Sequence, residues 1–371
     1  LYRYLRQRGV ARFGQFLLVV LVVLWGLEAK FQLEYATRGQ RNNRVAYSFI
    51  GSDHNYREML AQAGYNPEAY QAILPLPYYA IGSEKFDISG SSVSTFEGFR
   101  AALSLRRPLA AVMMSRTSAE QSMRLIQLFS SDLTPKPWVA HLPSDKPLLL
   151  LVSRRDSLRP AEKTLLRRAQ LLTANNQIQL YSLPVSAWAT TRPAQEAATF
   201  AALRPQLLAE GPLWRTAAGP ALVYRPFQDS TTTASFTSPG AVSGRASQAT
   251  LFDGPLPGAT DTTTYEISCW LYGKTANWMP AVRYRQLGTE GQVLEADDHS
   301  VKDATEISGD WVRYSRVVRL QHPANRIVLE VYGDEFIVDD LLIRPRSTSV
   351  YWLDQRGQLV FNGFPLHITP H

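Results

Sequence analysis

Two loops carry side chains of the types that bind anions. One loop follows the apolar run 108–114 and the other follows the apolar run 147–152. The candidate anion ligands in them are Arg116, Ser153, Arg154 and Arg155. Their donors could hold a phosphate or an acidic sugar. Neither loop has the glycines that let a backbone approach a phosphate, so the composition favours solvated loop residues and helix caps instead.

Aromatic side chains in the second half of the chain indicate a different chemistry. An aromatic ring can stack on the apolar face of a pyranose while neighbouring polar groups bind the sugar hydroxyls. The candidate rings are Trp270, Tyr272 and Trp278. Trp270 and Tyr272 alternate with Cys269 along one expected strand, whereas Trp278 lies in a turn-like segment where an exposed ring needs a reason. The alternative is that both tryptophans pack inside the protein.

Other reactive residues give weaker signals. The one close group of carboxylates with a histidine is Glu295, Asp297, Asp298 and His299. Such groups serve metal or acid–base chemistry, but this one falls in an expected loop, where charged side chains are ordinarily solvated. Cys269 is expected to be a buried thiol, because its neighbours in phase are apolar. The sequence contains no nucleophile elbow and no dinucleotide or Walker loop, and we assign no catalytic residue from it.

The longest apolar stretch, residues 13–27, lies near the N-terminus and follows four arginines. Gln15 is its single strongly polar residue. A charge-free run behind a basic flank is typical of a membrane helix whose basic side faces the cytoplasm. This pattern predicts anchoring in the inner, cytoplasmic membrane with most of the chain periplasmic or extracellular. A signal peptide and a buried helix are the alternatives, because a full span needs roughly 20 apolar residues.

The net charge of +7 has the same origin. Residues 1–44 contribute +6 of this charge, which leaves the remainder of the chain almost neutral. This distribution indicates contact with membrane lipid and argues against a nucleic-acid partner. Because residue 1 is Leu rather than Met, we also expect the chain to continue a longer protein with further transmembrane spans.

Between residues 45 and 228, apolar runs alternate with helical periodicity. Strands are expected at 70–81, 108–114, 147–152, 178–183 and 221–224. Helices are expected at 118–129, 160–174 and 195–208, the first with a capping box made by Thr117 and Glu120. Continuous apolar strands separated by amphipathic helices predict an α/β domain with a mostly parallel sheet.

Segments 13–27 and 70–85 (YQAILPLPYYAIGSEK) together resemble the extracytoplasmic C-terminal part of bacterial multi-pass membrane glycosyltransferase-like proteins. The resemblance covers about half of the chain. Those enzymes use acidic residues in loops between earlier spans, which this chain does not contain. The resemblance therefore transfers no catalytic residue.

The composition changes at residues 229–244, which are rich in Ser, Thr, Gly and Pro. Strands with alternating patterns are expected at 263–272, 281–286, 291–295, 310–320, 326–332 and 336–343. Short strands separated by turns predict an antiparallel β-sandwich over 229–348. In the tail, the turn DQRG between VYWL and QLVF predicts a hairpin.

The order YEISCWLYG, DWVRY, IVLEVYG and IVDDLL over residues 265–342 resembles the jelly-roll carbohydrate-binding modules of envelope and secreted proteins. This resemblance covers about a third of the chain and implies glycan binding. In that family an aspartate on the last strand often helps to hold a structural calcium, a part that Asp339 or Asp340 would take here. Trp311 opens a strand at the family's usual structural position and is expected in the core.

These patterns together predict a multidomain α/β plus all-β chain. Its parts would be a membrane helix with its flanks (1–44), an α/β domain (45–228), a jelly-roll β-sandwich (229–348) and a β-hairpin tail (349–371). The leading hypothesis is a non-catalytic, membrane-anchored extracytoplasmic module that binds or positions a cell-surface polysaccharide. The alternatives are the C-terminal portion of an integral-membrane glycosyltransferase with catalytic spans upstream, and a structural or protein-interaction module of the envelope.

Overall fold

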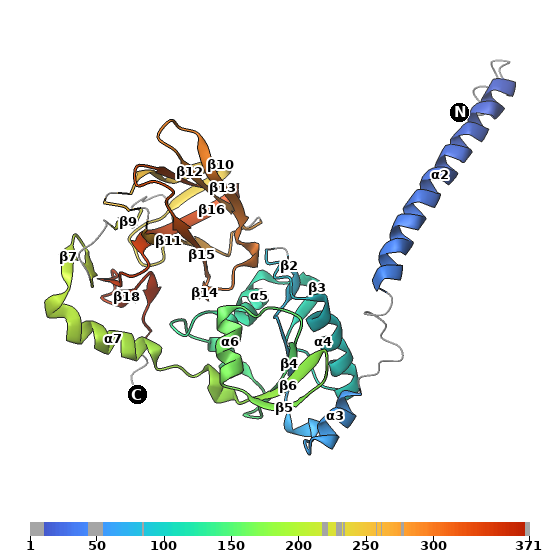
Figure 1. Cartoon of the computed structure of the whole chain (residues 1–371), viewed down its shortest axis with the longest axis horizontal. Coiled ribbons are helices and arrows are strands. Elements are labelled where there is room, and N and C mark those ends of the chain that lie inside the picture. The colour runs from blue at the N-terminus through green and yellow to red at the C-terminus, as the bar shows by residue number, and fades with distance from the viewer. Residues whose placement is uncertain are drawn as a thin grey trace. The chain divides into compact units, whose positions relative to one another are not determined.

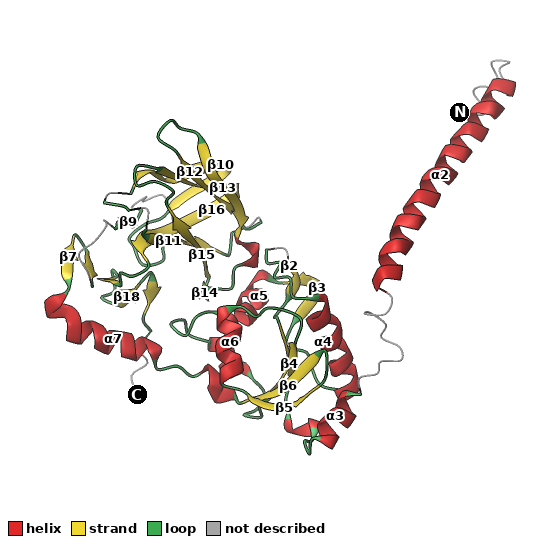
Figure 2. Cartoon of the chain, in the orientation of Figure 1, coloured by secondary structure: helices red, strands yellow, loops and turns green. Residues whose placement is uncertain are grey.

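The computed structural model describes residues 11–43, 55–83, 85–216, 222–227, 232, 234–256, 258–260, 262–275 and 278–367. The chain divides into two compact units, residues 1–55 and residues 56–371. Figure 1 colours the chain from its N-terminus to its C-terminus, and Figure 2 distinguishes its helices from its strands.

The first unit contains helix α2 (Ala11–Asn43), drawn in blue in Figure 1. Within the described chain, one segment, Gln15–Arg38, is long and apolar enough to cross a membrane, and an 18-residue window within it has a mean hydropathy of 1.9. Its large apolar side chains are exposed, Trp25 to 70%. A helix of this kind needs apolar surroundings that its own unit does not supply. A signal sequence near an N-terminus can also be this long and apolar.

The α/β part of the second unit is built on a four-stranded sheet in the order β1-β4-β6-β5. Its strands are β1 (Ile73–Leu76), β4 (Leu148–Ser153), β5 (Gln170–Ala174) and β6 (Ile178–Leu183). The prediction of a mostly parallel sheet is wrong, because β1 and β4 run parallel but β6 pairs antiparallel with both β4 and β5. The helix expected over 160–174 ends at Arg167, and β5 follows it. A tight turn then reverses the chain, since Asn175 Oδ1 accepts the N–H groups of Gln177 and Ile178, both at 2.8 Å.

Helices cover both faces of this sheet. The helices of this part are α3 (Tyr56–Gln62), α4 (Ser92–Leu105), α5 (Ala119–Ile126) and α6 (Pro160–Arg167), and helix α7 (Arg192–Leu203) follows it in the chain. Strand β4 is buried along its length, as its apolar run predicts. Leu149 and Leu151 pack with residues of α3 and α4, whereas Leu150 packs in the larger core that contains Leu165 of α6. Figure 2 shows α4 and α6 on opposite sides of the strands.

Strands β2 (Ala80–Ser83) and β3 (Val112–Thr117) form a separate parallel pair before helix α5. The capping box predicted for Thr117 and Glu120 is wrong. The N-cap is Ser118, whose side chain accepts the N–H of Gln121 at 3.2 Å. Thr117 remains in β3, where its hydroxyl donates to the Met114 carbonyl at 3.3 Å.

The β part is a large, curled antiparallel sheet. Its strands are β9 (Val223–Arg225), β10 (Val242–Pro255), β11 (Thr264–Tyr272), β12 (Ala281–Leu287), β13 (Val293–Ser300), β14 (Ile307–Ser308), β15 (Trp311–Arg319) and β16 (Arg326–Pro345). The 20-residue strand β16 connects the sheet. Its first half pairs with β12, its second half pairs with β11 and β9, and β10 runs along most of its length. The predicted all-β, antiparallel class is confirmed for this part, and the jelly-roll assignment stays a prediction.

The tail contains the expected hairpin, which forms part of a larger sheet. A five-stranded antiparallel sheet has the order β19-β18-β17-β8-β7. Its strands are β7 (Leu208–Glu210), β8 (Leu213–Arg215), β17 (Val350–Leu353), β18 (Leu359–Phe361) and β19 (Phe364–Pro365). Asp354 fixes the turn between β17 and β18 by accepting the N–H groups of Arg356 at 2.8 Å and Gln358 at 2.7 Å.

One hydrophobic core runs through the α/β part and the β part. It contains Leu74 and Met123 from the first and Cys269 and Val338 from the second. Gly273 permits this close packing, because a Cβ at that position would lie 2.7 Å from Met123 Sδ. Cys269 is fully buried, as predicted, and burial raises the pKa of its thiol to about 12.

Candidate functional site

The segment between β11 and β12 carries an exposed tryptophan. Trp278 is 67% exposed, whereas the next residue, Met279, is buried. Lys85, which follows β2, fixes the start of this segment: its Nζ donates to the Gly273 carbonyl at 3.1 Å and to the Thr275 hydroxyl at 3.3 Å. Because Lys85 and Thr275 are buried, this ammonium group positions the segment and is engaged within the protein.

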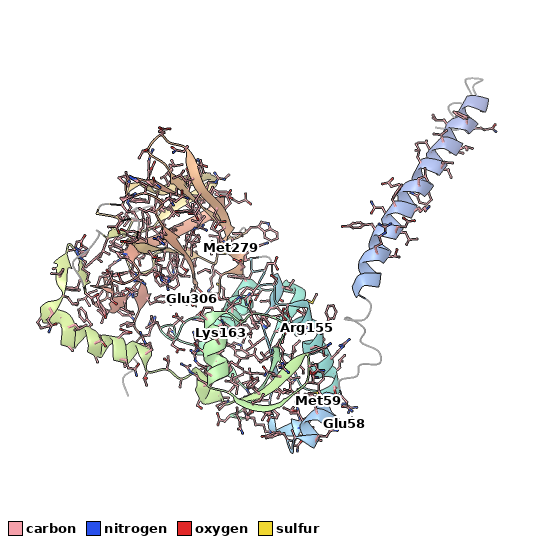
Figure 3. The ribbon with its side chains drawn as sticks, viewed as in Figure 1. Glu58, Met59, Arg155, Lys163, Met279 and Glu306 are labelled. Atoms are coloured by element: carbon pink, nitrogen blue, oxygen red, sulfur yellow. The ribbon has the colours of Figure 1, made fainter. Side chains whose placement is uncertain are left out.

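A cavity of about 290 Å³ lies beside the Trp278 ring, and we call it the Trp278 cavity. Its walls come from two regions that are distant in sequence. They include Gly82, Phe86 and Asp87 from the α/β part and Trp278, Met279, Ser300 and Lys302 from the β part. Figure 3 labels Met279 at the edge of the β part that meets β2. The cavity therefore depends on the packing of both parts against each other.

Two oppositely charged side chains line the Trp278 cavity and also contact solvent. Lys302 Nζ lies 3.3 Å from Asp87 Oδ2, and the Asp87 N–H donates to the Lys302 carbonyl at 2.9 Å. Both side chains are about half exposed, so their ion pair contributes little to stability. Beside an exposed ring, they offer one set of donors and one set of acceptors that can exchange water for the hydroxyls of a ligand.

The other two predicted rings lie elsewhere. Trp270 is 1% exposed, its indole N–H donates to the Gly363 carbonyl at 2.8 Å, and its ring packs 4.3 Å from that of Phe236. The prediction that Trp270 binds a glycan is therefore wrong, because neither face of its ring is accessible. Tyr272 is partly buried, 5.3 Å from the ring of Trp311. Trp311 is buried, as predicted for a core residue.

The predicted anion ligands do not form a common site among the described side chains. The side chain of Arg116 lies outside the described residues. Ser153 is buried and its hydroxyl donates to the Asp156 carboxylate, which places an acidic group beside the donor that an anion would need. Arg154 Nη1 donates to the Asn175 carbonyl at 2.9 Å, and Arg155 is exposed.

The predicted calcium ligands, Asp339 and Asp340, are buried and their oxygens are occupied by donors from the protein. These donors are the N–H of Phe236 (2.7 Å) and the hydroxyl of Ser238 (2.6 Å) on Asp339, and the hydroxyls of Tyr224 (2.9 Å) and Thr237 on Asp340. Calcium takes about 6–8 oxygen ligands, whereas the described residues contain no group of three or more His, Cys, Asp or Glu that could hold a metal. The two carboxylates therefore do not fit a calcium ion and instead attach segment 236–238 to β16. Burial raises the pKa of both carboxyl groups.

The group of carboxylates with a histidine lies on strand β13 rather than in the expected loop. Its three carboxylates pair with arginines, and its histidine lies beside a further carboxylate. Arg316 Nη2 lies 2.7 Å from Glu295, Arg316 also pairs with Asp297, Arg283 Nε lies 2.8 Å from Asp298, and His299 Nε2 lies 3.1 Å from Asp303. These pairs form a charged ladder on the sheet, without a convergent set of acid, base and nucleophile.

No protein-family model matches the chain, and no curated protein is similar to it in sequence. The CBM22-1 xylan-binding domain of Paenibacillus barcinonensis Xyn10C matches over 35% of this chain and 97% of its own, with 13% identity and a TM-score of 0.24. The C-terminal family 22 carbohydrate-binding module of Clostridium thermocellum Xyn10B matches over 37% and 87%, with 11% identity and a TM-score of 0.21. The VP2 subviral particle of infectious bursal disease virus matches over 38% and 39%, with 14% identity and a TM-score of 0.23. Matches at these TM-scores assign neither a family nor a ligand, and none of them supports the glycosyltransferase resemblance.

Of the residues that line this cavity, the sequence predicts Trp278 as a candidate and gives no signal for Asp87 and Lys302. These two residues are 215 positions apart, each in a short polar segment without a motif. The pattern around each of them resembles that of any solvated loop. Their pairing follows only from the contact between the α/β part and the β part, which no local signal predicts.

Proposed function

We propose that this chain is a membrane-anchored, extracytoplasmic module that binds a cell-envelope glycan in the Trp278 cavity. The proposal rests mainly on one observation, the 67% exposure of Trp278 beside a cavity that also contains Asp87 and Lys302. An indole exposed to this extent leaves much apolar surface in water, so a ligand that covers the ring gains the free energy of burying it.

A pyranose matches the chemistry of these residues. Its apolar face would stack on Trp278, while its hydroxyls would donate to Asp87 and accept from Lys302. The cavity volume of about 290 Å³ suits one sugar unit of a longer chain, whose neighbouring units would extend into solvent. The role is one of binding, and we propose no reaction at this site.

Helix α2 and its basic flank support the anchoring part of the proposal. The segment Gln15–Arg38 has the apolar length for a span, and the arginines that precede it would remain in the cytoplasm. Residues 56–371 would then lie on the other side of the inner membrane. The glycan would be a component of the cell envelope within reach of that membrane.

The experiment is binding of the full chain, in a detergent without a sugar headgroup, to an array of immobilised envelope polysaccharides. We expect Trp278→Ala to weaken binding about ten-fold or more, as expected for an aromatic residue at the centre of a contact. Trp278→Phe keeps a ring and should retain most of the affinity. Val317→Ala is the matched control, because Val317 is 52% exposed on β15 of the same sheet.

Two results would reject the proposal. One is the absence of binding to every polysaccharide on the array. The other is a glycan that binds equally well to the wild type, to Trp278→Ala and to Val317→Ala. Membrane anchoring is tested separately, by extracting cell membranes with alkaline carbonate: an integral helix keeps the chain in the pellet, whereas a cleaved signal peptide releases it.

A further inference from the structure

A second cavity, of about 210 Å³, lies where helix α6 meets the β part. Its lining combines apolar side chains, among them Leu128, Leu165 and Trp188, with polar and charged ones that include Lys136 and Glu306. Figure 3 labels Glu306 on the side of the β part that faces α6. The cavity shares no lining residue with the Trp278 cavity and forms a separate candidate site.

Lys136 contributes a positive charge to this cavity. Its Nζ donates to the carbonyl oxygens of Ser130 at 2.8 Å and Ser131 at 2.9 Å. An ammonium group has three donors, so one N–H remains for a ligand. Burial lowers the pKa of Lys136 to about 8, because the carboxylates of Glu306 and Asp132 offset only part of the lost solvation.

Glu306 contributes the negative charge from the β part. Its Oε2 accepts the N–H of Ser131 at 2.9 Å, and burial raises the pKa of its carboxyl group. In the described part of the chain no ion pair joins Glu306 to Lys136, although both line the same cavity. Asp132, which also lines it, is already paired with Arg168, with 3.2 Å between Oδ1 and Nη1. The cavity is therefore lined by two partly buried groups of opposite charge that form no direct ion pair with each other.

We propose that this cavity binds a small zwitterion, an α-amino acid with an aliphatic side chain. The carboxylate of the ligand accepts a hydrogen bond from Lys136, its ammonium group donates to Glu306, and its side chain packs against Leu165 and Trp188. Each end of such a ligand brings a counter-charge to a partly buried group that has no direct ion-pair partner among the described residues, and so offsets part of the solvation that this group has lost.

The lining of the cavity favours this ligand class over a sugar. A volume of about 210 Å³ has room for a small molecule. The hydroxyls of Ser130 and Thr164 also line the cavity, but they already donate to the carbonyls of Thr305 at 2.8 Å and Pro160 at 3.1 Å, so they are poor partners for the hydroxyls of a sugar. The indole N–H of Trp188 is itself engaged, because it donates to the Leu128 carbonyl at 3.2 Å.

The first test is isothermal titration calorimetry of the full chain in detergent with L-alanine, L-valine and L-leucine. Two analogues of leucine each lack one charge: 4-methylpentanoic acid lacks the ammonium group, and 3-methylbutylamine lacks the carboxylate. We expect at least one amino acid to bind, and leucine to bind about ten-fold or more tightly than either analogue. If none of the three amino acids binds, or if an analogue binds as well as leucine, the proposal is overturned.

The second test uses variants with matched controls. Glu306→Gln keeps an oxygen that accepts the Ser131 N–H and removes the charge, so it should melt at the wild-type temperature and lose about ten-fold in affinity. Lys163→Met removes an exposed charge from α6 outside the cavity and should leave the affinity unchanged. Unchanged affinity in Glu306→Gln overturns the assignment. Trp278→Ala should also leave amino-acid binding intact, so this proposal and the glycan proposal can fail independently.

Discussion

Trp270 and Trp278 belong to the same stretch of chain and lie in opposite environments. Trp270, on β11, is 1% exposed, whereas Trp278, just beyond that strand, is 67% exposed. Residues far away in sequence make the difference, because Phe236 and Phe364 cover the ring of Trp270. A tryptophan of the β part thus becomes a core residue when a distant segment covers it, and remains available for binding when none does.

The acidic residues beside the two rings differ in the same way. Asp339, the cross-strand partner of Trp270, is fully buried and accepts hydrogen bonds from the segment that covers the ring. Asp87, at the Trp278 cavity, is half exposed and pairs with Lys302. Buried carboxylates therefore hold the covering segment in place, whereas the exposed pair stays accessible to a ligand.

Trp270→Ala should have the largest effect on stability. The change removes a ring packed between Phe236 and Phe364 and leaves the Gly363 carbonyl without its indole donor. Truncating a buried tryptophan costs about 3–5 kcal/mol, and we expect a loss of that size in the free energy of unfolding, measured with urea. Trp278→Ala removes the same side chain from an exposed position and should cost less than about 0.5 kcal/mol. Equal losses in the two variants would contradict the contrast between the two rings.

Gly273→Ala tests the close packing of the chain between the two tryptophans. A Cβ at this position would lie 2.7 Å from Met123 Sδ and 3.1 Å from the Asp310 carbonyl oxygen. Overpacking of this kind costs about 1–3 kcal/mol, which thermal unfolding would detect as a lower Tm. Gly254→Ala is the matched control, because its nearest neighbour would be 3.8 Å away. The packing argument fails if the two variants melt together.

Asp340→Asn tests whether burial raises the pKa of this carboxyl group. Burial and the negative charge of Asp339 raise the pKa of Asp340, so the folded protein keeps a proton that the unfolded chain releases above its ordinary pKa of about 3.9. Stability is therefore highest at low pH and falls as the pH rises from about 4 through the folded pKa. Asparagine cannot ionise, and it tolerates the positive φ of 51° at this position.

As the pH rises from 5 to 8, the free energy of unfolding of Asp340→Asn should increase relative to that of the wild type by on the order of 1 kcal/mol. Urea denaturation at the two pH values measures this gain. Asp87→Asn changes a half-exposed carboxylate and serves as the control. A parallel pH dependence in the wild type and in Asp340→Asn would show that Asp340 is ionised in the folded state across this range.

The parts of the fold that the sequence predicts well are those with strong local patterns. The apolar run of β4 correctly indicated a strand buried on both faces, and the alternation around Cys269 indicated a buried thiol. The error in the α/β sheet has a local cause as well. Residues 170–174 continue a helical pattern of apolar positions, but the turn at Asn175 pairs them with β6 instead. A hairpin and the end of a helix compete there, and pairing with the sheet decides the outcome.

The candidate site was less predictable than the fold. Trp278 could be identified because a large ring in a polar turn is unusual, but its partners could not, since Asp87 and Lys302 meet through tertiary contacts alone. The same limit explains the error at Trp270. Alternation along β11 assigns a side chain to a face, whereas the tail that covers that face is distant in sequence.

The ion pair between Asp87 and Lys302 should contribute little to stability, in contrast to the buried carboxylates near Trp270. A double-mutant cycle of Asp87→Asn and Lys302→Met should give a coupling energy of about 0.2–1 kcal/mol, reduced further by added salt, because half-exposed charges are well solvated. The backbone hydrogen bond from Asp87 to Lys302 survives both changes and keeps the two segments together. In each single variant, the loss in the free energy of glycan binding should exceed the loss in the free energy of unfolding. A ligand that displaces water from these groups depends on their hydrogen bonds. A coupling well above 1 kcal/mol with unchanged glycan binding would instead make this pair a structural contact between the α/β part and the β part.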